Sequence, residues 1–180
     1  MRLFIAIEVP PLVTTPNPSG APAAPEHLTL RFLGEVASER LPGIRSALEG
    51  VADASAPFEI VLDGVGAFPS SANPRVVWVR VTVGHREVCA LAERVAAALA
   101  TELPGAPPEA FVPHLTLFRV RSAAHRQRAR ALLSGAERSL PPRTVRVQEI
   151  YLKESTLTPQ GARHRTLAAY PLTGRTETAP

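Results

Sequence analysis

The tetrapeptide His-Leu-Thr-Leu occurs twice in this chain of 180 residues, at positions 27–30 and again at 114–117. Residues i and i+2 of a β-strand point to the same face, so each copy would place its histidine and threonine on one face and its two leucines on the other. The leucines can then be buried while the imidazole and the hydroxyl stay at a surface or in a cleft. Two such strands brought together form a site with two imidazoles and two hydroxyls, which suits acid–base chemistry at a phosphate.

The elements around the two motifs repeat in the same order, which indicates an internal duplication. Motif strands are predicted at 27–33 and 114–120, and each is followed by a predicted helix whose N-cap is Ser38 in the first half and Ser122 in the second. A third helix is predicted over 85–100 from apolar residues at helical spacing. The remaining predictions are strands at 2–9, 57–63, 75–83, 143–152 and 164–170, loops at 10–25, 64–74 and 101–113, and a frayed tail from Thr173.

The predicted fold class is therefore α+β, with two pseudo-symmetric lobes around a central cleft. Each lobe is expected to be an antiparallel sheet with flanking helices. The length fits one domain built from two similar halves, so we expect residues 1–180 to form a single bilobal domain with one His-Leu-Thr-Leu motif per lobe.

Composition narrows the protein class. The formal net charge is +4, and Lys153 is the only lysine, so the basic side chains are almost all arginine, whose planar fork suits phosphate. A GC-rich genome is an equally good explanation of the arginines, because it also favours proline and alanine. Cys89 is the only cysteine, which excludes an internal disulfide and a cysteine-based metal site and fits a cytoplasmic protein. No apolar run approaches the roughly 18 residues of a membrane span, and the N-terminal run, interrupted by Glu8, is too short for a signal peptide.

The two motifs and their flanks resemble those of the two-histidine (2H) phosphoesterase superfamily. Within it, the chain is similar to the RNA 2′,3′-cyclic phosphodiesterases, also called 2′-5′ RNA ligases. The matching stretches are residues 1–9, 27–36, 111–119 and 151–155, with Leu157, Pro159, Gly161, Pro171 and Leu172. The chain departs from the family pattern in two places. Residues 10–26 are short and proline-rich where the family has a longer segment with a helix, and His164 stands where the family tends to have an aromatic residue.

The resemblance implies that the chain opens a ribose 2′,3′-cyclic phosphate with water to give a 2′-phosphomonoester. Two imidazoles on opposite sides of one phosphorus can take the proton of the water and protonate the leaving oxygen. The resemblance makes His27 the proton donor and His114 the proton acceptor, although the near-symmetry of the motifs leaves the opposite assignment open. Thr29 and Thr116 can donate hydrogen bonds to the non-bridging oxygens. A cyclic phosphodiester carries a single negative charge, so we expect no metal and no other cofactor.

By the same resemblance, Phe32 is expected to stack on a base and Arg119 to pair with phosphate. Strict alternation would instead put Arg31 and Phe118 on the histidine face, so Phe32 and Arg119 reach the cleft only if each strand ends or bulges after its motif. Core packing is the alternative for both phenylalanines. The other candidates have simpler interpretations. A solvent-exposed surface position is predicted for Arg31, Arg80, Arg121 and Arg126, and a core position for Trp78 and Cys89. No functional role is assigned to His85, His125 and His164.

Two other functions stay open at this point. One is a related reaction, namely ligation or cleavage of 2′-5′ linkages or hydrolysis of another cyclic nucleotide. The other is an RNA- or nucleotide-binding module without catalysis, against which the two intact motifs argue, because a binder would not need both imidazoles. The expected partner is an RNA or oligonucleotide with a 2′,3′-cyclic phosphate end. We expect a monomer with no obligate protein partner and no membrane association.

Overall fold

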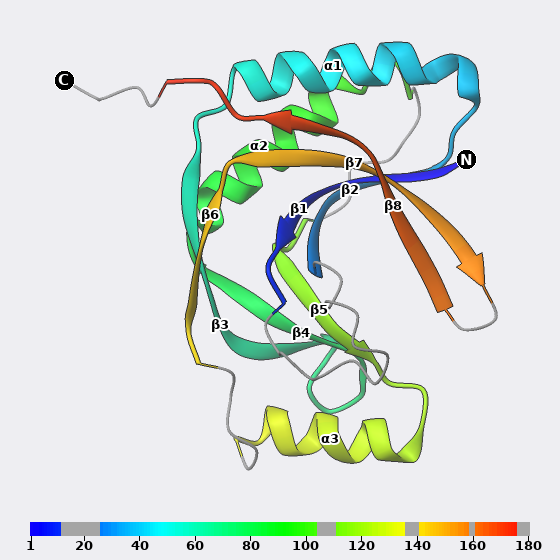
Figure 1. Ribbon diagram of the computed structural model, residues 1–180. Helices are drawn as coiled ribbons and strands as arrows, with labels where there is room; N and C mark the ends of the chain where they lie inside the picture. Colours follow the sequence, from blue (N-terminus) through cyan, green and yellow to red (C-terminus); the bar gives the residue numbers. More distant parts are fainter. Residues whose placement is uncertain (12–25, 104–110, 136–140, 159–160, 176–180) are drawn as a thin grey trace, which may run out of the picture.

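The computed structural model describes residues 1–11, 26–103, 111–135, 141–158 and 161–175, which form two antiparallel sheets and three α-helices (Figure 1). The predicted loops at 10–25 and 101–113 fall largely outside these residues. The first sheet has the strand order β2-β1-β7-β8 and the second has the order β5-β4-β3-β6. The bounds of the first sheet's strands are β1 Arg2–Val9, β2 Glu26–Glu35, β7 Glu149–Thr158 and β8 Gly161–Pro171. Those of the second are β3 Phe58–Pro69, β4 Pro74–Val83, β5 His114–Arg119 and β6 Arg143–Val147.

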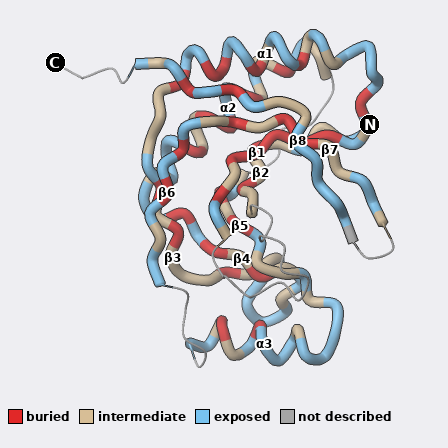
Figure 2. The backbone as a smooth tube through the Cα atoms, in the orientation of Figure 1, coloured by how far each residue is buried: buried red, intermediate tan, exposed pale blue. Residues whose placement is uncertain are grey.

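The two motif strands, β2 and β5, are the edge strands of their sheets, and they contact each other. The predicted α+β class with two similar lobes is confirmed by this arrangement. One face of each sheet is apolar and packs into a shared core with helices α1, Leu41–Asp53, and α2, His85–Ala98. Figure 2 shows this buried material along β1 and on the inward sides of α1 and α2. The other faces of the two sheets carry the histidines and threonines.

Helix α3, Ala123–Leu133, packs on the second sheet below β3 and β4 (Figure 1). Its predicted N-cap is confirmed, because the Ser122 hydroxyl accepts a hydrogen bond from the His125 backbone N–H at 3.1 Å. The prediction that Ser38 caps α1 is wrong. Ser38 begins a 3₁₀ turn, Ser38–Arg40, and α1 starts after it without a side-chain cap. Pro42 lies in the first turn of α1, where its missing N–H costs no intrahelical bond.

Three segments differ from the sequence predictions. Residues 64–69 belong to β3, because the strand continues beyond Gly64, whose φ of 70° accompanies a register shift against β4. The predicted strand 143–152 is two strands that pair in different sheets, β6 with β3 and β7 with β1. The predicted frayed tail is held to the fold at its first residue, because the Thr173 N–H donates a hydrogen bond to the Ala52 carbonyl at 3.1 Å. No helix in the described part of the chain is long and apolar enough to cross a membrane.

Candidate active site

The first motif lies on β2, where the pairing with β1 sets which side chains face the cleft. His27 lies opposite Glu8 and Thr29 lies opposite Ala6. Leu28 is fully buried in the shared core, so the leucines have the packing role predicted for them. The imidazole and the hydroxyl are therefore left on the other face of the first sheet.

The second motif lies on β5 and repeats this arrangement against β4. His114 is paired with Arg80 and Thr116 with Trp78, while Leu115 is fully buried in the core. Arg80 is exposed and shares the face of His114, so the structure brings it to the site although its sequence context indicated only a solvated surface. The register across an edge strand, which local sequence does not specify, decides this placement.

Each motif ends in a β-bulge. In β2, the partner of Ile5 is Arg31 and the partner of Ala6 is Thr29, so Leu30 is the extra residue. One extra residue reverses the alternation, and Phe32 therefore shares a face with the first motif's histidine and threonine. Phe32 is 59% exposed, which excludes the core-packing alternative, and its ring lies 5.9 Å from that of Phe4.

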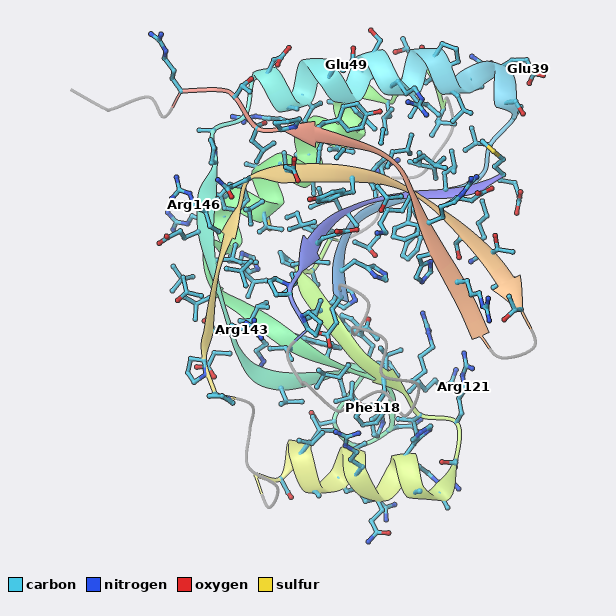
Figure 3. The ribbon with its side chains drawn as sticks, viewed as in Figure 1. Glu39, Glu49, Phe118, Arg121, Arg143 and Arg146 are labelled. Carbon is cyan, nitrogen blue, oxygen red and sulfur yellow. The ribbon has the colours of Figure 1, made fainter. Side chains whose placement is uncertain are left out.

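The bulge in the second motif has the same position. Trp78 pairs with Thr116 and Val77 pairs with Phe118, so Leu117 is the extra residue. Arg119 thus shares the cleft face with the second motif. Phe118 points the other way and packs on α3, where Arg128 lies 5.2 Å above its ring (Figure 3).

A cavity of about 540 Å³ lies between the two lobes. Thr29 and Phe32 line it from the first motif strand, and His114 lines it from the second. Cys89, for which the sequence indicated a core position, is half-exposed and lines it from α2. Arg31, for which the sequence indicated a solvated face, also lines this cavity, whereas His27, Thr116 and Arg119 do not.

His27 is partly buried beside two aromatic rings and a partly buried ion pair. Its ring centroid lies 5.1 Å from that of Phe4 and 4.8 Å from that of His164, an imidazole on β8 to which the sequence assigned no role. The pKa of His27 is lowered from 6.5 to about 4, first by burial and then by the charges of His164 and Lys153. The Glu8 carboxylate acts in the opposite direction and raises this pKa. The imidazole is therefore neutral near pH 7.

The ion pair beside His27 joins three strands. Lys153 on β7 is buried and pairs with the carboxylate of Glu8 on β1. The Lys153 ammonium also donates to the hydroxyl of Thr166 on β8 at 2.9 Å, and that hydroxyl donates to Glu8 at 3.2 Å. The only lysine of the chain is thus part of a closed polar network on the cleft face, which the sequence pattern did not reveal.

His114 has a defined tautomer when it is neutral. Its Nδ1 lies 2.7 Å from the carbonyl oxygen of Val112, and because a carbonyl can only accept, Nδ1 must carry the hydrogen. The other nitrogen, Nε2, is then free to accept a proton. The ring is supported by Phe68 at 5.0 Å and Trp78 at 5.8 Å. Gly66 leaves room for the Trp78 indole, since a Cβ at that position would lie 2.5 Å from it.

The contacting strands β2 and β5 therefore carry two imidazoles, two hydroxyls and an arginine on their cleft-side faces. Within the described residues, no group of three His, Cys, Asp or Glu side chains is placed to hold a metal ion. The arrangement can move protons between a bound molecule and water on two sides, and it can donate hydrogen bonds to an anion between them.

Comparison with known proteins points the same way. The sequence profile of the 2′-5′ RNA ligase superfamily matches residues 6–157. A curated RNA 2′,3′-cyclic phosphodiesterase of Archaeoglobus fulgidus is 36% identical over 94% of this chain and 99% of its own length. One of Thermus thermophilus, with the same name, is 31% identical over 97% and 91% of the two chains. Among solved structures, E. coli LigT without ligand superimposes with a TM-score of 0.68 at 27% identity, covering 96% of this chain and 97% of LigT. LigT has also been crystallised with 3′-AMP.

Proposed function

The chain belongs to the 2′-5′ RNA ligase superfamily, and on this basis we propose that it hydrolyses the 2′,3′-cyclic phosphate ends of RNA to 2′-phosphomonoesters. The observation that carries the proposal is the pair of imidazoles on the facing edge strands β2 and β5. The names of curated relatives similar over nearly the whole chain support the substrate. In this proposed function, residues 1–180 form one bilobal domain that acts as a cytoplasmic monomer on an RNA or oligonucleotide end.

In the proposed reaction, water attacks phosphorus opposite the 3′ oxygen. The bond between phosphorus and the water oxygen forms while the bond from phosphorus to the 3′ oxygen breaks. His114 takes the proton of the water at Nε2, and His27 gives a proton to the 3′ oxygen, which leaves as a hydroxyl. Thr29 and Thr116 are proposed to donate hydrogen bonds to the non-bridging oxygens, where negative charge increases in the transition state.

The tautomer of His114 supports its role as the base, because Nε2 is the unprotonated nitrogen. His27 must gain a proton before it can act as the acid, since its pKa of about 4 leaves it neutral near pH 7 without substrate. The negative charge of the phosphodiester can provide for this. At a separation of about 4 Å and an effective dielectric constant of about 20, the attraction between a protonated His27 and the phosphodiester is about 4 kcal/mol. This attraction favours protonation of His27 by a factor of roughly a thousand.

The proposed substrate contacts beyond the motifs are a base against Phe32 and phosphate against Arg119. The exposed ring of Phe32 and the placement of both residues on the histidine faces support this assignment. We expect the reaction to need no metal, because the histidines supply both proton transfers and the substrate carries one negative charge.

The test is to incubate the protein with an oligoribonucleotide that ends in a 2′,3′-cyclic phosphate, in excess chelator, and to identify the product by phosphorus NMR. A 2′-phosphate as the single product is expected. A 3′-phosphate or a mixture would overturn the proposed orientation of the ribose, and loss of activity that a particular metal restores would overturn metal independence. Tight binding without turnover would favour the binding-module alternative.

A further inference from the structure

His164 and His27 lie on strands that are far apart in the first sheet. The order β2-β1-β7-β8 separates their strands by three steps, each roughly 4.8 Å, so a flat sheet would keep the backbones about 14 Å apart. The ring centroids are nevertheless 4.8 Å apart and nearly perpendicular, at an interplanar angle of 78°. The sheet must curl to bring them together, and Figure 1 shows β7 and β8 bending along their length.

Both imidazoles rest on the same apolar side chain. Phe4, which is 1% exposed, lies 5.1 Å from the ring of His27 and 5.0 Å from that of His164. Three rings from β1, β2 and β8 therefore form one cluster. A ring held on two sides in this way has few orientations available, so His164 restricts the orientation of His27.

The charged groups around the cluster have little net charge. Lys153 from β7 and Glu8 from β1 form an ion pair beside it, and Thr166 of β8 bridges the two. Burial and the Lys153 charge also lower the pKa of His164, and the charge of His164 is among the causes that lower the pKa of His27. Two imidazoles in contact over an apolar ring cannot both be protonated without strong repulsion.

We propose that His164 is a positioning residue for His27, holding its ring over Phe4 and limiting the two imidazoles to one proton between them. The proposal rests on the assignment of His27 as a reacting group in the proposed function. It adds that the pH range in which His27 can exchange a proton is set by a residue on β8, outside both motifs. A phosphate end bound at the cleft would then stabilise the singly protonated pair.

The experiment compares three variants by NMR titration of the His27 ring in the ligand-free protein. His164→Phe keeps a ring against Phe4 but removes the nitrogens, whereas His164→Ala removes the contact altogether. His85→Phe is the matched control, because His85 is an exposed histidine at the start of α2 that contacts Cys89 and is not part of the ring cluster of His27, Phe4 and His164. We expect the midpoint of His27 to rise in both His164 variants and to stay at its wild-type value in His85→Phe.

A second readout separates positioning from charge. In His164→Phe, kcat on a cyclic phosphate end should be retained, while the limb of the kcat/KM profile that reports His27 moves to higher pH together with the NMR midpoint. In His164→Ala, kcat should fall several-fold as well, because the His27 ring loses a support. An unchanged midpoint in both variants would overturn the proposal, whatever the activity. The titration needs no turnover, so failure of the proposed function would be seen separately, as absence of hydrolysis in the wild type.

Discussion

Lys153→Met is the substitution with the clearest expected cost. It removes the ammonium group but keeps an unbranched side chain of similar length, so the loss is chiefly electrostatic. The Lys153 side chain is 8% exposed, and its partner Glu8 is 22% exposed. Without the ammonium, the Glu8 carboxylate keeps only the Thr166 hydroxyl as a hydrogen-bond partner among the residues that the structure describes.

Breaking a buried pair from one side costs about 3–5 kcal/mol, because the remaining charge is left without a partner. Glu8 retains some contact with solvent, so we expect the lower end, about 3 kcal/mol. Glu8→Gln combined with Lys153→Met removes both charges and should cost less, about 1 kcal/mol, since no charge is stranded. The single variant should also raise the pKa of His27, because the Lys153 charge lowers it and the Glu8 carboxylate raises it.

Urea unfolding at pH 7 of the wild type, both single variants and the double variant gives the coupling energy of the pair. The reasoning would be refuted if Lys153→Met lost less than about 1 kcal/mol, or if the double variant lost as much as the single one. Histidine NMR on the same proteins checks the sign of the effect on His27.

Three further predictions concern the site. His27→Ala and His114→Ala should each lower kcat about 10²–10⁴-fold without lowering the melting temperature. Thr29→Ala and Thr116→Ala should have a smaller effect, a loss of about 1.5–3 kcal/mol of transition-state stabilisation. Single-turnover kinetics of the four variants measures both effects. The pKa of His27 is about 4 in the folded protein and 6.5 in the unfolded chain, so the unfolded chain binds more protons between these two pH values. The free energy of unfolding should therefore fall by up to about 3 kcal/mol as pH falls from 6.5 to 4. Comparing urea unfolding of the wild type and His27→Gln across that range isolates the contribution of this histidine. RNA affinity should fall only moderately with salt, and a slope steeper than about −4 in log affinity against log salt, or about six phosphate contacts, would contradict this.

The elements that the sequence predicted well are those whose signals are local. The strand at 2–9, the helix over 85–100 and the Ser122 cap follow from apolar spacing and a capping hydroxyl, and the structure has all three. The pattern over 143–152 is equally regular, yet the chain passes from one sheet to the other at Gln148. Pairing partners are contacts between distant segments, and periodicity within one segment carries no information about them.

The same distinction applies to the site. The placement of His27 and Thr29 follows from alternation and buried leucines, and the need for a bulge to bring Phe32 to that face could be deduced as well. The approach of His164 to His27 could not, because it depends on how strongly four strands curl. The polar network of Lys153 could not be predicted for the same reason, since its three members lie on three different strands.

The paired bulges also give direction to a nearly symmetric cleft. Each motif is followed by the same two residue types in opposite order, Arg31-Phe32 in one lobe and Phe118-Arg119 in the other. Because both bulges fall at the same motif position, the reversed order puts an aromatic ring on the first lobe's cleft face and a guanidinium on the second's. Phe32 and Arg119 therefore give the two lobes different side chains just beyond the motifs, while Arg31 and Phe68 also line the cavity between the lobes. The two lobes thus carry a histidine and a threonine at matching positions, and the reversed order of the two residues after each motif makes the lobes differ in the side chain that follows.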